Sequence, residues 1–165
     1  DITTGSPAVV VAIIDQGVHW EHPDLIQNVW INSDEDINAD SVFECWPSPE
    51  TRDGVSGDLN GVDDDGNNYI DDVVGLMFMA DALLPSPNVL PRVLRSPSKW
   101  HGTYVASQIG ARTNNGIGMA GIAGGWVGTP GVKLMLVGVE TYMGTLVEKA
   151  VQYVLANLPA DAPLP

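Results

Sequence analysis

Basic residues and cysteine are both scarce in this chain of 165 residues. Its 7 lysines and arginines stand against 21 aspartates and glutamates, which gives a formal charge of −14. This charge repels nucleic acid and anionic membrane surfaces, so we expect neither as a partner. It also favours bound cations wherever the carboxylates cluster. Cys45 is the single cysteine, which excludes an internal disulfide.

Long apolar runs and a recognisable leader segment are absent as well. No run approaches the roughly 18 apolar residues of a membrane span, so none is predicted. The chain begins with Asp1 rather than Met, which suggests a processed or trimmed start and leaves room for a targeting segment that has been removed. Apolar residues still make up 44% of the sequence, enough for one domain with its own core.

The stretch from Val9 to Asp15 organises the rest of the chain. Six apolar residues, mostly β-branched, run directly into a carboxylate, and Gln16 and Gly17 then break the pattern. Such a run is typical of a strand buried on both faces of a parallel sheet. Chemistry in open α/β sheets gathers at the carboxyl ends of the strands, so Asp15 is a candidate functional residue. The alternative is that Asp15 only caps the following turn.

Further apolar patterns predict an α/β fold with a parallel sheet. Runs at 73–79 and 132–139 predict two more strands. Helices are predicted from residue 101 to 110 and from 146 to 157, the second capped by Thr145. Residues 26–62 show no periodicity and are expected to form a long surface excursion. The glycine-rich stretch 116–128 has no phosphate-loop lysine, so it does not indicate nucleotide binding. The apolar face expected for the second helix comprises Leu146, Val147, Ala150, Val151, Val154 and Leu155.

Asp15 and His101 are two members of a possible catalytic triad. His101 begins a predicted helix, where an imidazole can act as a base. In a triad a carboxylate holds the imidazole in one tautomer, and the imidazole accepts the proton of a serine hydroxyl. His19 and His22 have the spacing of a metal-binding pair, but no third ligand follows, and a structural role for His22 is the preferred interpretation.

An acidic segment between residues 63 and 72 predicts a calcium loop. It holds five carboxylates in ten residues, a density that needs a counter-ion in an ordered loop. Alternating oxygen side chains resemble the start of a calcium-binding loop, although the glycine is one position off the EF-hand pattern and the closing Glu is missing. The alternative is a solvated acidic loop. The ligands expected for structural Ca²⁺ are Asp63, Asp65, Asn67, Tyr69, Asp71 and Asp72.

Several blocks in the same order resemble subtilisin-like serine proteases, the subtilases. "DITTGSPAVVVAIIDQGVHWEHPDL" resembles the Asp block of that family, and "HGTYVAS" resembles its His block. "NNGIGMAGIAG" and "VKLMLVGVE" resemble the segments that follow, and "NGVDDDGNNYIDDVVGLMF" resembles an acidic insert of some bacterial members. The resemblance covers nearly the whole chain. It implies a doubly wound parallel sheet, with Asp15 as the orienting carboxylate and His101 as the general base.

The chain also departs from the family pattern. Gln16, Trp100, Tyr104 and Ser107 replace the usual Ser or Thr, Gly, His and Gly. The nucleophile block Gly-Thr-Ser-Met-Ala-x-Pro and the oxyanion-hole asparagine segment are absent from these residues, so we expect the chain to be inactive by itself. The resemblance thus makes residues 1–165 the N-terminal part of a catalytic domain, incomplete at its C-terminal side. Residues 26–99 form a loop-rich insert, with the calcium loop at 58–72.

Three interpretations follow from the missing serine block. The chain is a fragment of a serine endopeptidase, or one of two chains that together form it, or a degenerate subtilase that serves as an inactive structural or binding subunit. Half of a parallel sheet leaves an apolar edge, so we expect another protein chain to cover it. The resemblance further implies polypeptide substrates and an extracellular or periplasmic location.

Overall fold

Three parallel strands form the centre of the computed structural model, which describes residues 4–41, 43, 58, 60–80, 85, 100–126, 128–141 and 143–158. They are β1 (Val10–Asp15), β2 (Gly75–Phe78) and β5 (Lys133–Val139), and their order in the sheet is β1-β5-β2. The central strand β5 pairs with β1 from Val10↔Lys133 to Asp15↔Gly138. This sheet confirms the α/β class and the three strands that the apolar runs predicted.

Strand β2 is shorter than its apolar run because a glycine begins it. Gly75 has φ of +125°, a conformation that side chains other than glycine rarely adopt. A Cβ atom at this position would lie 1.8 Å from the carbonyl oxygen of Leu136 on β5. The close approach of the two backbones therefore requires glycine.

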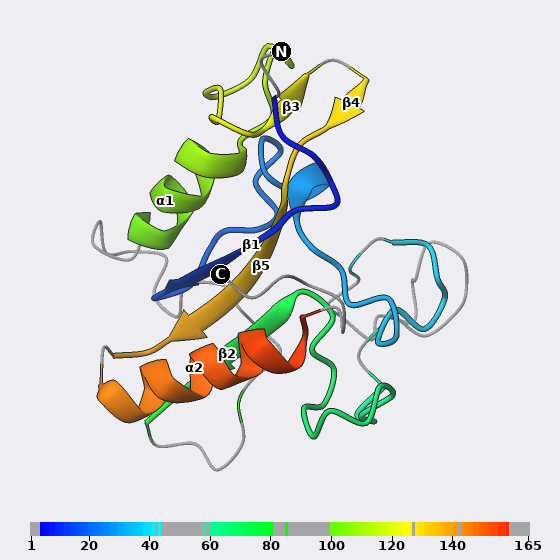
Figure 1. Ribbon diagram of the computed structural model, residues 1–165, viewed down its shortest axis with the longest axis vertical. Coiled ribbons are helices and arrows are strands. Elements are labelled where there is room, and N and C mark those ends of the chain that lie inside the picture. Colours follow the sequence, from blue (N-terminus) through cyan, green and yellow to red (C-terminus); the bar gives the residue numbers. More distant parts are fainter. Residues whose placement is uncertain are drawn as a thin grey trace.

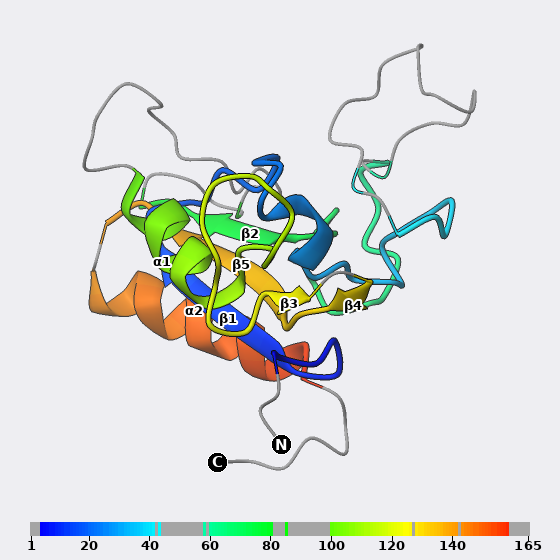
Figure 2. The same cartoon turned by 90° about the horizontal axis from the view of Figure 1, so that it is seen from above.

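Two helices cover the opposite faces of the sheet, as Figures 1 and 2 show. α1 (His101–Gly110) packs with Ala106 against a cluster that includes Ile13 and Leu134. α2 (Gly144–Ala156) packs with Leu146 against the other face. Alternate residues of β5 point to the two clusters, as the pleat of a strand requires. No helix in the described segments is long and apolar enough to cross a membrane.

The start and the buried face of α2 differ from the prediction. The cap position is Met143, and no side chain caps the helix, so the proposed Thr145 cap is wrong. The buried residues are Leu146, Ala150 and Tyr153, a stripe at spacings of four and three. Val151 and Leu155 are 42% and 54% exposed, because only the narrow stripe reaches the sheet.

The first part of the predicted surface excursion, residues 26–41, is instead partly buried. It contains the 3-10 helix η1 (Ile26–Asn28), and Val29 then forms an isolated parallel bridge with Leu134. The buried Asn28 amide donates hydrogen bonds to the carbonyls of Gly110 (2.8 Å) and Gly124 (3.0 Å), which joins the segment to the end of α1. Most of residues 42–59 and 81–99 of the predicted insert lies outside the described residues.

A small hairpin that the sequence did not reveal begins in the glycine-rich stretch. β3 (Gly125–Trp126) pairs antiparallel with β4 (Thr129–Pro130). The preceding loop is held by Asp24, whose buried carboxylate accepts hydrogen bonds from the Asn115 amide (2.8 Å) and from the backbone N–H of Met119 (2.9 Å). The loop is therefore fixed by a side chain far away in the sequence.

Candidate active site

Asp15 and His101 meet at the carboxyl end of the sheet. Asp15 is the last residue of β1, and His101 is the first residue of α1. Asp15 Oδ2 lies 2.6 Å from His101 Nδ1, while Asp15 Oδ1 accepts a 2.7 Å hydrogen bond from the backbone N–H of Gln16. The Asp15 side chain is 7% exposed and the His101 side chain is 65% exposed. The pair thus presents a buried carboxylate to one edge of a solvent-facing imidazole.

The two residues after His101 bring the helix close to β1. A Cβ atom at Gly102 would lie 2.5 Å from the carbonyl oxygen of Gly17 and 2.9 Å from Asp15 Cβ, so only glycine allows this approach. Thr103 Oγ1 accepts a 3.0 Å hydrogen bond from the backbone N–H of His19. The motif His-Gly-Thr therefore aligns the imidazole, the backbone and the loop after β1 with respect to one another.

His19 and Trp100 form an aromatic contact beside this pair. Their rings are T-shaped, with centroids 5.7 Å apart. His19 also contacts the ring of His22 at 6.2 Å, and its Nε2 lies 3.8 Å from a carboxylate oxygen of Glu21. His22 Nδ1 accepts a hydrogen bond from the backbone N–H of Asp24, which fits the structural role preferred for His22.

The acidic loop brings two of its six predicted ligands together. Carboxylate oxygens of Asp63 and Asp65 lie within 4.8 Å of each other and of a Glu35 oxygen. Glu35 is fully buried, and its Oε1 accepts hydrogen bonds from the backbone N–H groups of Asp64 (2.8 Å) and Asp65 (3.2 Å). Its Oε2 is buried and has no hydrogen-bond partner. An unmatched oxygen beside two further carboxylates suits a hard cation.

The other predicted ligands make hydrogen bonds within the loop and to helix α2. Asn67 Oδ1 accepts from the Tyr69 N–H, and Asp71 accepts from the N–H groups of Asn60 and Gly61. Asp72 Oδ2 accepts a 2.7 Å hydrogen bond from the Tyr153 hydroxyl on α2. These contacts order the loop around the cluster of Glu35, Asp63 and Asp65.

Burial changes the acidity of the groups around this cluster. It raises the pKa of Glu35 to about 7, partly opposed by the two backbone hydrogen bonds. Burial also raises the pKa of Asp72, against the hydrogen bonds from Tyr153 and Asn67. The pKa of Tyr153 is well above its usual value because of burial and the charge of Asp72. Glu35 therefore keeps its proton up to about pH 7 unless a cation lies beside it.

Glu35 is the site residue that sequence reasoning missed. Glu35 is far from the acidic loop in the sequence, so no motif with a fixed ligand spacing connects the two segments. The available signal was the run Asp34-Glu35-Asp36, a second acidic stretch in a segment without periodicity.

Comparisons with known proteins identify the family. No family model matches the chain. The chain is 32% identical over 114 residues to subtilisin-like protease 1 of Plasmodium vivax, 69% of this chain and 13% of that protein. It is 34% identical over 125 residues to an extracellular protease of Xanthomonas campestris pv. campestris, 76% of this chain and 17% of that protein. The chain belongs to the subtilisin-like protease family.

A third match agrees with this subtilase assignment. The chain is 32% identical over 124 residues to an extracellular basic protease of Dichelobacter nodosus, 71% of this chain and 16% of that protein. The chain thus spans less than a fifth of the length of these curated relatives. The predicted family is confirmed, whereas the catalytic roles of Asp15 and His101 and the calcium ligands stay predictions.

Two departures from the subtilase pattern have a local explanation in the structure. Ser107, in the place of a glycine, is buried and its hydroxyl donates a 2.7 Å hydrogen bond to the carbonyl of Thr103 one helical turn earlier. Tyr104, in the place of a histidine, is 61% exposed on the outer side of α1. Neither substitution disturbs the contact between Asp15 and His101.

Proposed function

We propose that this chain supplies the Asp and His of a subtilisin-type serine endopeptidase that cleaves polypeptides. The contact of 2.6 Å between Asp15 Oδ2 and His101 Nδ1 carries the proposal. An ionised carboxylate can only accept a hydrogen bond, so Nδ1 bears the proton and Nε2 is free to accept another. This is the tautomer that a general base needs.

The proposed mechanism assigns one task to each residue. His101 Nε2 accepts the proton of a serine hydroxyl as that oxygen attacks the peptide carbonyl, and it later delivers the proton to the leaving amine. Asp15 holds the ring and stabilises the imidazolium that forms. None of the described serines is hydrogen-bonded to His101. The nucleophile is therefore proposed to come from a segment outside these residues, in the same protein or in a companion chain.

Labelling with a serine-reactive phosphonate tests this function. The probe is applied to the assembly or longer protein that contains this chain. We expect one labelled serine, with labelling lost in His101→Ala and retained in Tyr104→Ala, which changes an exposed residue of the same helix. Absence of labelling in the unmodified protein would instead favour an inactive structural or binding subunit.

Calcium is proposed as a structural ion at the acidic loop. Glu35, Asp63 and Asp65 would hold it, and Asn67, Tyr69, Asp71 and Asp72 would order the surrounding loop. The unmatched Oε2 of Glu35 supports a cation at this position. When bound, the ion supplies positive charge that offsets the repulsion among the carboxylates.

A protein segment is proposed to cover the free edge of β1. Strand β5 is almost fully buried, whereas Val10, Val11, Ala12 and Ile14 of β1 are only half-buried. Within the described chain, β1 pairs on one side only. If the isolated chain sediments as a monomer and binds no apolar dye, this proposal fails. Since two relatives are named extracellular proteases, we also propose a secreted location.

A further inference from the structure

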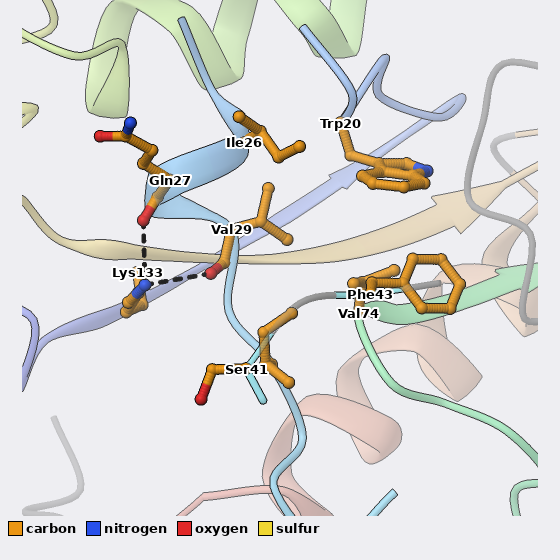
Figure 3. A pocket seen from close by; sticks show the side chains of 9 residues that line it. Trp20, Ile26, Gln27, Val29, Ser41, Phe43, Val74 and Lys133 are labelled. Atoms are coloured by element: carbon orange, nitrogen blue, oxygen red, sulfur yellow. Dashed lines mark hydrogen bonds between the residues drawn. The ribbon is translucent and has the colours of Figure 1, made fainter. Parts of the chain in front are cut away.

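An apolar groove with one cationic end lies on the face of the sheet that α1 covers. Its volume is about 340 Å³. Trp20 and Phe43, whose ring centroids are 5.0 Å apart, form one end. Val29 and Val74 lie along the groove, and Lys133 is at the other end, as Figure 3 shows. None of its lining residues belongs to the Asp15–His101 pair or to the acidic cluster.

Lys133 is held at its end of the groove by two backbone carbonyls. Its Nζ donates hydrogen bonds to the carbonyl of Gln27 (3.0 Å) and to that of Val29 (3.3 Å), both shown in Figure 3. An ammonium group has three N–H donors, so one donor has no acceptor among the described residues. The half-buried cation is thus fixed in place and can still donate one hydrogen bond.

Neither Lys133 nor Arg112 makes an ion pair with a carboxylate among the described residues. Burial lowers the pKa of Lys133, and the charge of Arg112 lowers it further. The chain has three times as many acidic as basic residues. Lys133 is thus a cation without an ion-pair partner among the described residues of a strongly negative molecule.

We propose that this groove binds a monocarboxylic acid with an apolar chain. The carboxylate accepts the remaining N–H of Lys133, and the apolar chain extends over Val29 and Val74 toward Trp20 and Phe43. Ligand sites of this kind are mostly apolar, occupy about 300–1,000 Å³ and orient their ligand through a few polar groups. A neutral hydrocarbon would leave the third N–H of the Lys133 ammonium without an acceptor. A dianion would be repelled more strongly by the net negative charge of the molecule, and only one N–H donor would be available for its two charges.

Decanoate and 1-decanol are the matched probes, because they differ at the polar end. We expect decanoate to bind the full chain with one site by titration calorimetry and to shift the indole resonance of Trp20 in NMR spectra. Decanol should bind more weakly. Lys133→Met should weaken decanoate binding by roughly tenfold, the usual effect of losing one hydrogen bond to a charged group, and should leave decanol binding unchanged. Lys149→Met, on the exposed side of α2, is the control and should change neither.

A second variant tests the apolar wall without disturbing the core. Ile26 lines the groove and is 43% exposed, so Ile26→Asp is expected to fold, as circular dichroism can verify. The added carboxylate should abolish decanoate binding. The proposal is overturned if decanoate does not bind, if decanol binds equally well, or if decanoate binds Lys133→Met or Ile26→Asp as tightly as it binds the unmodified chain.

Discussion

In the proposed mechanism, Asp15 determines which nitrogen of His101 carries the proton. An asparagine in its place can either donate or accept, so the preference for a proton on Nδ1 is lost. We expect Asp15→Asn to shift His101 toward the Nε2–H tautomer at alkaline pH, measured from the ¹⁵N shifts of the three histidines. His22 is an internal control, because its Nδ1 accepts a backbone N–H and its tautomer should not change. An unchanged tautomer of His101 in Asp15→Asn would contradict the orienting role of Asp15.

Glu35 makes the stability of the metal-free chain depend on pH. Its pKa is raised from 4.5 to about 7, so the folded chain retains a proton at pH values where the unfolded chain has lost it. The stability from this group is complete below pH 4.5 and falls as the pH rises through about 7. We expect Glu35→Gln to remove this fall, measured by urea unfolding in chelator across the pH range. Glu148→Gln, which changes an exposed residue of α2, should retain the fall in stability with rising pH.

Single residues were predictable where an ionisable side chain stands at the end of an apolar run or at the start of a helical pattern. Asp15 was found because an apolar run stops at it, and His101 because a helical pattern starts there. Glu35 was not found, because its role depends on a loop that only the fold brings near. Tyr153 was missed for the same reason, since its hydroxyl becomes useful only beside Asp72.

At the level of elements, the close approach of α1 to β1 depends on Gly102. An alanine methyl would meet the backbone of Gly17 at 2.5 Å, so helix or strand must move. We expect Gly102→Ala to destabilise the fold by about 1–3 kcal/mol of overpacking, more than the gain of up to about 1 kcal/mol from helix propensity.

The matched control for this glycine is Gly144, the first residue of α2. A Cβ atom there would meet nothing within 4 Å. Gly144→Ala should therefore be neutral or stabilise by up to about 1 kcal/mol, measured by the same urea unfolding. Equal stabilities of the two variants would contradict the close approach.

Elements with continuous apolar patterns were predictable, and elements fixed by side chains from elsewhere were not. All three central strands follow from continuous apolar runs. Helix η1 and the β3–β4 hairpin have no such run. They are fixed by Asn28, which bonds to Gly124, and by Asp24, which holds the preceding loop. Such contacts span long sequence separations and leave no local period.

For the whole molecule, the calcium ion proposed above would offset part of the formal charge of −14. At constant ionic strength, we expect Ca²⁺ to raise the melting temperature relative to chelator. The stabilisation should be about 2.7 kcal/mol when the free ion is at a hundred times its Kd. Mg²⁺ should do less, because it loses its water reluctantly.

Two variants separate a specific site from general charge screening. Glu35→Gln should lose most of the effect of Ca²⁺, and Asp34→Asn, which changes an exposed carboxylate next to it, should keep it. Equal responses of the two variants, or no shift with Ca²⁺ in the unmodified chain, would exclude the loop as a cation site.

The order β1-β5-β2 has a consequence for how the protein is made. β1 is synthesised well before Lys133–Val139, its only described hydrogen-bonded neighbour. At about 5–20 residues per second, the ribosome needs roughly ten seconds to supply that neighbour. Throughout this interval the apolar segment Val10–Ile14 has no sheet to join. The interval is far longer than the microseconds in which local structure forms. Newly made chains are therefore most exposed to aggregation, and most in need of a chaperone, before β5 emerges.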